Sequence, residues 1–256
     1  MNPSETNKLL CITSRILFKK LAAQKSEKIL IYHVGNIGDI IVATPVYRSI
    51  RKAFPEAKIT LLTSPGKRGL PGAKEIIAPL NLVDELKIYY PEELSSVKRL
   101  IEFFRGIKKG YYDLLIYLPA NQWGLWHILR DMIFFRLAGI RYAVGFKIYE
   151  GYYLYKKYRQ MPVSEVDRLK QLIEPLNLVY CEQKLEFPVK SEDRCFATDL
   201  FHQYDIKEER LRIIVHPGGK KPSKLWPSKN FALLVDRLIE ELEGQVILVG
   251  GVMKLK

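Results

Sequence analysis

Short apolar runs alternate with amphipathic segments along most of the chain. Runs rich in β-branched residues predict strands at 28–34, 58–63, 85–90, 112–118, 212–216 and 245–251, with a short strand or turn at 139–146. Apolar residues at helical spacing predict helices at 95–109, 123–138, 163–178, 194–204 and 228–242. This alternation predicts an α/β fold in which helices cover both faces of parallel sheets. Residues 149–158, which include five tyrosines, are expected to form a loop over the binding face.

The first predicted strand ends in a glycine turn, Gly35 to Gly38, and Asp39 follows directly. In open α/β sheets, ligands bind at the carboxyl ends of the strands, and glycines let the backbone approach a ligand closely. A carboxylate at this edge can accept a proton from a sugar hydroxyl. Asp39 could instead cap a helix. However, Thr44 and Pro45 also form a good helix start, and a helix that began there would leave Asp39 in a loop.

A second unit of strand and glycines lies far downstream. The fifth predicted strand leads into Gly218 and Gly219, and three lysines follow within five positions: Lys220, Lys221 and Lys224. Backbone N–H groups and ammonium groups together suit phosphate oxygens, so this loop is a candidate phosphate site. Ordinary solvated lysines are the alternative. Ser228 is expected to cap the next helix, after which the last predicted strand completes a βαβ crossover. His216 is interpreted either as a buried histidine or as a group in a cleft.

Composition limits the class of protein. With 256 residues, 48% of them hydrophobic and 27% charged, the chain suits a soluble globular protein of one or two domains. The three cysteines are widely separated, which indicates a reducing compartment. The four scattered histidines argue against a zinc site, and no apolar run reaches the ~18 residues of a membrane span.

The net charge of +13 predicts an anionic partner. The sequence contains no RNA-stacking motif or zinc finger, and its basic residues are spread over the whole chain. A phosphorylated substrate or an acidic membrane surface is therefore favoured over nucleic acid. Residues 7–23 predict a basic amphipathic helix, with a shared apolar face formed by Leu9, Ile12, Ile16 and Leu17. Such a helix either lies at a membrane interface or packs on the domain that follows.

Three segments together match the pattern of one family. They are the glycine turn with its continuation (residues 35–45 and 48–55), the Tyr-Asp-Leu-Leu-Ile of 112–116, and the His-Pro-Gly-Gly of 216–219 with Lys-Leu-Trp-Pro at 224–227 and Phe231. In this order they resemble glycosyltransferase family 9, the ADP-heptose:lipopolysaccharide heptosyltransferases and their relatives, from about residue 29 to the last residue. The resemblance implies a GT-B-like fold. In this fold two Rossmann-like domains with parallel sheets face each other across a cleft, and no metal or other cofactor is required.

On that resemblance the chain divides into a basic N-terminal helix (1–28), an acceptor-binding domain (29–190) and a nucleotide-sugar-binding domain (191–256). A composition change at 184–193 is a candidate hinge. The last domain has about half of the ~100–150 residues that a nucleotide-binding domain usually needs. We therefore expect the chain to be truncated, with weak donor affinity and low turnover unless the remainder is supplied in trans.

The resemblance also implies roles for individual residues. Asp39 corresponds to the family's acidic residue, which acts as general base. Lys224 corresponds to a lysine that offsets the charge on the leaving diphosphate. Gly218 and Gly219 correspond to the turn near those phosphates, where Ser223 might replace the small hydroxyl residues of relatives. The acceptor-side candidates are Gly35, Asn36, Gly38, Arg141 and Lys147. The last two would also fit an ordinary exposed face.

The expected function is metal-independent, inverting transfer of a heptose or similar sugar. The donor would be ADP-heptose or another nucleotide-diphosphate sugar, and the acceptor an anionic glycolipid such as a lipopolysaccharide core. The expected place is the cytoplasm, at the inner face of the membrane. The alternative is a catalytically inert remnant or an acceptor-binding module. A dinucleotide-dependent oxidoreductase is disfavoured because no Gly-x-Gly-x-x-Gly follows the first strand and no acidic residue ends the second.

Overall fold

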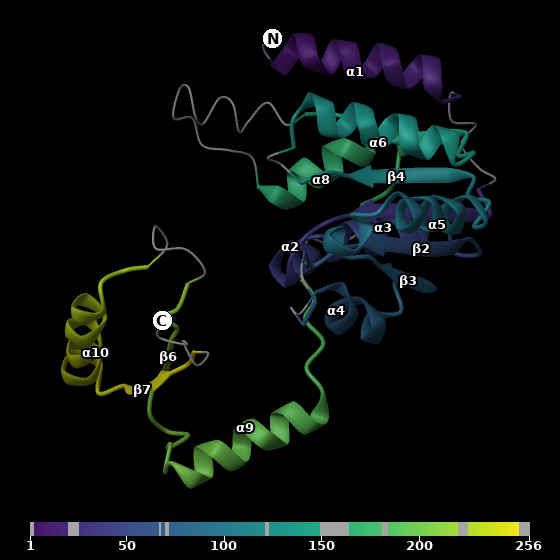
Figure 1. The fold of residues 1–256 in the computed structure, drawn as a ribbon. Coiled ribbons are helices and arrows are strands. Elements are labelled where there is room, and N and C mark those ends of the chain that lie inside the picture. Colours follow the sequence, from purple (N-terminus) through teal and green to yellow (C-terminus); the bar gives the residue numbers. More distant parts are fainter. Residues whose placement is uncertain are drawn as a thin grey trace. The chain divides into compact units, whose positions relative to one another are not determined.

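The computed structural model describes residues 3–19, 26–66, 68–69, 72–120, 123–148, 164–180, 184–219 and 225–250. The chain divides into two compact units, residues 1–188 and 189–256 (Figure 1). Each unit contains its own sheet and is described by itself.

The first unit is built on a five-stranded sheet in which all neighbouring strands pair in parallel. The order across the sheet is β3-β2-β1-β4-β5. The strands are β1 (Lys28–His33), β2 (Lys58–Thr63), β3 (Glu85–Ile88), β4 (Leu114–Leu118) and β5 (Tyr142–Val144). Strands β2 and β3 are added on one side of β1, and β4 and β5 on the other side. The switch point of the sheet, where the order of strands reverses, therefore lies between β1 and β4. The crevice outside the carboxyl ends of these two strands is therefore the place where such a sheet binds ligands.

The three middle strands are apolar because both of their faces are covered. In β1 and β2 every residue after the first is buried, and β4 is buried throughout. Successive side chains enter opposite cores, as Ile31 and Tyr32 do in β1. Asp113 fixes the start of β1, because its Oδ2 accepts the N–H groups of Glu27 and Lys28 over 3.0 and 2.9 Å.

Four helices and a short 3-10 turn cover one face of the sheet. They are α2 (Ile37–Val42), α3 (Thr44–Ala53), α4 (Ala73–Leu80), α8 (Glu165–Ile173) and the turn η2 (Glu174–Leu176). Their buried residues, among them Ile50, Ile76 and Leu169, form a mainly aliphatic core with the strands. The sequence did not predict α4, a helix of eight residues that contains Pro79.

Three helices cover the other face: α1 (Pro3–Leu17), α5 (Val97–Lys108) and α6 (Leu125–Leu137). The core here is aromatic, with the Tyr32 ring centroid 5.5 Å from that of Tyr117 and 5.2 Å from that of Phe135. Leu10 of α1 and the following Phe18 are buried in it, and α1 lies alongside α6 (Figure 1). The predicted packing of α1 on the domain is therefore confirmed, and its side chains Leu9, Ile12 and Ile16 stay exposed. Within the described ranges, no helix is both long and apolar enough to cross a membrane.

After η2 the chain returns to α3. The N–H of Glu186 donates to Thr44 Oγ1 over 3.1 Å, and the Glu186 carboxylate forms an ion pair with Arg48. The candidate hinge at 184–193 therefore begins with residues that are held against the first unit.

The second unit contains α9 (Ser191–Gln203), β6 (Arg212–Val215), α10 (Ser228–Leu242) and β7 (Gln245–Leu248). Strands β6 and β7 pair in parallel, so the predicted βαβ crossover is confirmed. Ser228 is the first residue of α10 and does not cap it, because the helix follows directly on Pro227. Neither α9 nor α10 contains a buried residue, and Val215 is the one large buried side chain among the described residues of this unit.

Candidate functional site

Asp39 lies in the first turn of α2, just beyond the carboxyl end of the central strand β1. The Asn36 N–H donates to Asp39 Oδ2 over 2.8 Å, so the carboxylate caps this helix. The expectation that a helix start at Thr44 leaves Asp39 in a loop is wrong, because a separate helix of six residues precedes α3. The Asp39 side chain is nevertheless exposed, and Oδ1 has no hydrogen-bond partner among the described residues. Capping thus uses one carboxylate oxygen and leaves the other available to a ligand.

Gly35 and Gly38 lack a side chain for different steric reasons. A Cβ at Gly35 would lie 2.6 Å from the Cβ and 3.0 Å from Oδ2 of Asp39, so the absence of a side chain lets the turn close on the carboxylate. A Cβ at Gly38 would meet nothing within 4 Å, and Gly38 is exposed. The backbone at position 38 is therefore open to a ligand.

A buried pair of polar rings lies behind this turn. His33, the last residue of β1, shares a hydrogen bond of 2.6 Å with the Tyr47 hydroxyl of α3. Burial and the positive charge of Arg168 lower the pKa of His33 to about 3, so the imidazole is neutral at pH 7. Burial and the negative charge of Asp39 raise the pKa of Tyr47, so its hydroxyl keeps its proton. The pair is a neutral, fully buried support beneath the exposed carboxylate.

Arg168 extends this group to the neighbouring strand. It is 2% exposed, donates to the carbonyl oxygen of Pro119 over 2.9 Å, and pairs with Glu165 over 2.6 Å. Pro119 follows β4, so Arg168 of α8 lies at the carboxyl edge of the sheet. We call His33, Asp39, Tyr47 and Arg168 the carboxyl-edge cluster; its charges act on one another across the ends of β1 and β4.

The sequence prediction included Asp39 but missed the three buried members of this cluster. Tyr47 and Arg168 occupy helix positions next to apolar residues, where a polar side chain is unusual. This unusual placement was the sequence signal that could have pointed to Tyr47 and Arg168. It does not show which strand end the two side chains lie against.

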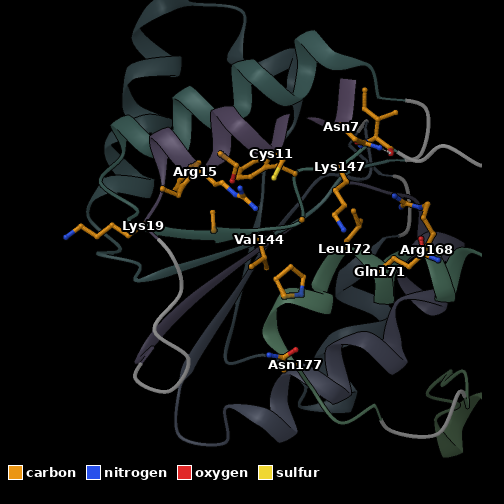
Figure 2. Close-up of a pocket in the computed structure, with 17 residues that line it drawn as sticks. Asn7, Cys11, Arg15, Lys19, Val144, Lys147, Arg168, Gln171, Leu172 and Asn177 are labelled. Carbon is orange, nitrogen blue, oxygen red and sulfur yellow. Dashed lines mark hydrogen bonds between the residues drawn. The ribbon is translucent and has the colours of Figure 1, made fainter. Parts of the chain in front are cut away.

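A large hollow of about 1100 Å³ lies beside β5, between α1 and α8. Figure 2 shows the side chains of Arg15 and Lys147 directed into it. Lys147 Nζ lies 4.0 Å from Glu174 Oε2, and Arg168 also lines the hollow. Of the two predicted acceptor-side cations, Lys147 therefore faces a cavity. The other, Arg141, is exposed and is not among the residues that line the hollow.

The donor-side candidates follow β6 in the second unit. Gly218 and Gly219 are both exposed, and so is His216, so the interpretation of His216 as a buried histidine is wrong. Lys224 and Ser223 lie outside the described residues.

Two α/β units, each with a parallel sheet, define a Rossmann-like protein, and Asp39 lies where such a sheet binds its ligands. A family model described as glycosyltransferase family 9 (heptosyltransferase) matches residues 100–254, which is more than half of the chain, and the chain belongs to this family. The match includes the segment at 216–227 and begins after the turn that carries Asp39. A comparison with curated proteins finds none that matches.

Solved structures agree with the family. The chain is similar to a family 9 glycosyltransferase from Veillonella parvula, with a TM-score of 0.64 and 20% identity over 90% of this chain and 64% of that one. It is also similar to the E. coli heptosyltransferase WaaC with ADP (TM-score 0.53, 14% identity, 88% and 68% of the two chains) and with ADP-2-deoxy-2-fluoro heptose (0.51, 13%, 88% and 70%). These likenesses confirm the predicted fold class, α/β and GT-B-like with parallel sheets. The chain spans 64% of the length of the Veillonella protein.

Proposed function

We propose that this chain carries out, or contributes to, metal-independent, inverting transfer of a sugar from a nucleotide diphosphate to a glycolipid. The observation that carries the proposal is the exposed Asp39 carboxylate at the switch point of the sheet of a family 9 chain. One of its oxygens is anchored by the Asn36 N–H, and the other has no partner among the described residues. The Asp39 carboxylate is thus held in place by one oxygen, while its other oxygen can still accept a proton.

In this proposal the acceptor hydroxyl oxygen attacks the anomeric carbon of the donor sugar from the side opposite the diphosphate. The hydroxyl proton passes to Asp39, the bond between the anomeric carbon and the phosphate oxygen breaks, and its electron pair leaves with the diphosphate. A base within hydrogen-bond reach contributes about 10²- to 10⁴-fold to such a step. The buried pair His33 and Tyr47 supports the turn and exchanges no proton, because both groups stay neutral at pH 7.

The donor side of the proposal rests on the loop after β6. The exposed backbone at Gly218 and Gly219 suits a diphosphate, and Lys224 and Ser223 are proposed as its side-chain partners. A lysine there offsets the charge that grows on the leaving group, a role that a divalent cation has in other transferases. The E. coli protein WaaC was solved with ADP and with an ADP-heptose analogue, so we propose ADP-heptose or a related nucleotide sugar as donor.

The acceptor side rests on the first unit. We propose that Gly35, Asn36 and Gly38 form the wall along which the acceptor sugar lies, and that Lys147 and Arg141 meet its anionic groups. The open side of Gly38 and the position of Lys147 in the hollow support this assignment. A lipopolysaccharide core or similar anionic glycolipid also fits the net charge of +13, and it would place the protein at the cytoplasmic face of a membrane.

A transfer assay with several nucleotide sugars tests the base. Asp39→Asn keeps an oxygen for the Asn36 N–H but cannot take a proton, so we expect turnover to fall about 10²- to 10⁴-fold while the thermal midpoint stays unchanged. Asp199→Asn is the matched control, because it makes the same chemical change at an exposed acid of α9. Equal turnover in the wild type and in Asp39→Asn would remove Asp39 as the base.

Titration calorimetry with ADP separates the enzyme from an inert acceptor-binding module. Saturable binding that is lost in Lys224→Ala supports the transferase, with Lys229→Ala as a control cation on α10. A chain that folds, as judged by circular dichroism, but binds no ADP would favour the inert module.

A further inference from the structure

One surface of the first unit exposes large apolar side chains on two neighbouring helices. They are Leu9 (39% exposed), Ile12 (57%) and Ile16 (77%) on α1, and Trp126 (80%), Ile133 (51%) and Leu137 (66%) on α6. We call these six residues the α1/α6 face. Scattered apolar residues are common on protein surfaces, but a contiguous group of this size marks an interaction site.

Helical spacing shows that the α6 members form one outward stripe. Trp126, Ile133 and Leu137 recur at intervals of seven and four residues, so they lie on one side of the helix. The buried side chains of α6, which include Ile128 and Met132, lie on the opposite side and pack on the sheet. The stripe therefore points away from the core.

The α1 members lie on the flank of their helix that is nearer to α6. Cys11 and Ser14 of α1 line the hollow beside β5, on the other flank of this helix. Leu9 and Ile16 lie opposite these residues on the helical wheel, and Ile12 lies on the outer side. Because α1 and α6 are in contact, as Figure 1 also shows, we infer from the helical wheels that the two apolar groups lie on neighbouring sides of the helix pair.

Cations outnumber acids on the helices that form and adjoin the α1/α6 face. Helices α1, α5 and α6 together carry eight lysines and arginines and three acids, and one of these acids, Asp131, is buried. Lys8 and Arg136 belong to the two helices of the face, whereas Arg15 is directed into the hollow beside β5 and Arg130 pairs with Asp131 over 2.7 Å. Apolar side chains that enter the acyl region and cations that meet anionic headgroups are the pattern of an interfacial membrane helix.

We propose that the α1/α6 face docks on an anionic lipid bilayer, with the six apolar side chains inserted and the neighbouring cations at headgroup level. A second copy of the chain fits less well, because a two-fold contact would bring these cations against themselves. The inference rests on the proposed function only in its expectation of a membrane-bound acceptor, and lipid binding is measured without any transfer reaction.

Co-sedimentation of the full chain with vesicles tests this docking. We expect binding to phosphatidylcholine vesicles that contain phosphatidylglycerol, and at least about tenfold weaker partition to phosphatidylcholine alone or at high salt. Ile16→Asp combined with Ile133→Asp changes two exposed side chains and should weaken partition at least about tenfold. Val179→Asp combined with Leu185→Asp is the matched control, because both side chains are exposed (76 and 48%), lie outside the face, and make the same change in charge.

Two results would overturn the proposal. One is equal partition of the double variant and the wild type when both have wild-type circular dichroism. The other is a dimer in solution that the double variant converts to a monomer, with no vesicle binding by either form, which would assign the face to a second copy. Vesicle binding by a chain that transfers no sugar would leave the docking intact while removing the proposed function.

Discussion

The carboxyl-edge cluster depends on side-chain chemistry at single positions. Asp39 is exposed and capped on one oxygen, whereas His33, Tyr47 and Arg168 are buried behind it. A buried cation is tolerated here because Arg168 has a carboxylate and a carbonyl oxygen as partners. Burial, together with the positive charge of Arg168, lowers the pKa of His33 and keeps its imidazole neutral. The charge of Arg168 thus affects the protonation of His33, and the charge of Asp39 affects the protonation of Tyr47.

Two glycine substitutions separate steric support from ligand contact. Gly35→Ala places a methyl group against the Asp39 side chain, so we expect it to displace the carboxylate and lower transfer activity at least about tenfold. The methyl group introduced by Gly38→Ala would have no atom within 4 Å, so the fold should accept this substitution with little change in thermal midpoint. Activity lost in Gly38→Ala with unchanged stability would locate the ligand at this backbone. Full activity in both variants would contradict a site at the turn.

The buried His33 predicts how stability depends on pH. Its pKa is about 3 in the folded chain and near 6.5 when unfolded, so the unfolded chain binds more protons between these values. The free energy of unfolding should therefore fall on acidification through this window, by up to about 1.4 kcal/mol per pH unit from this group. Urea unfolding of the wild type and of His33→Gln at several pH values measures the slope. Parallel curves for the two proteins would show that His33 does not titrate in this way.

At the scale of elements, the site depends on how tightly β4 and β5 approach each other. Gly145 follows β5 with a φ of +99°, and a Cβ there would lie 1.9 Å from the carbonyl oxygen of Tyr117 in β4. This contact brings residues 145–148 to the wall of the hollow that Lys147 lines. Asn7 of α1 holds the same segment, with hydrogen bonds of 2.9 and 2.7 Å to the backbone of Ile148.

Gly139 provides a matched control for this approach. Both glycines have a φ of +99°, but a Cβ at Gly139 would meet nothing within 4 Å. Gly139→Ala should therefore cost about 1–2 kcal/mol from the left-handed backbone alone. Gly145→Ala should cost at least about 3 kcal/mol, because the Tyr117 carbonyl must also move. Urea unfolding compares the two variants, and equal losses would argue against the close contact.

At the scale of the whole molecule, the two units differ in the amount of core that they bury. The first unit encloses an aliphatic and an aromatic core on the two faces of its sheet. In the described part of the second unit, large apolar side chains such as Phe196, Ile214 and Leu248 are exposed, at 66, 67 and 66%. Since burial of apolar surface is the main source of stability, the units should differ in resistance to local opening.

Amide hydrogen exchange followed by mass spectrometry measures this difference. We expect amides of β1 and β4 to be protected to near the global free energy of unfolding, and those of β6, β7 and α10 to exchange at least about a hundredfold faster. Addition of ADP should slow exchange after β6 if the loop at 216–219 binds the diphosphate. Equal protection of both units without ligand would contradict the difference in burial.

The sequence alone determined the features that depend on local pattern. Apolar runs such as 58–63 specify strands because each residue must be buried on one face or the other, and the glycine turn with Asp39 specifies where the central strand ends. Tertiary structure decided the rest. Whether Asp39 lay in a loop or in a helix, and which side chains met behind it, depended on the packing of α2, α3 and α8 against the strand ends. Spacing along the chain cannot encode interactions such as the effect of the Arg168 charge on His33, because residues so distant in sequence come near each other only once the sheet has formed.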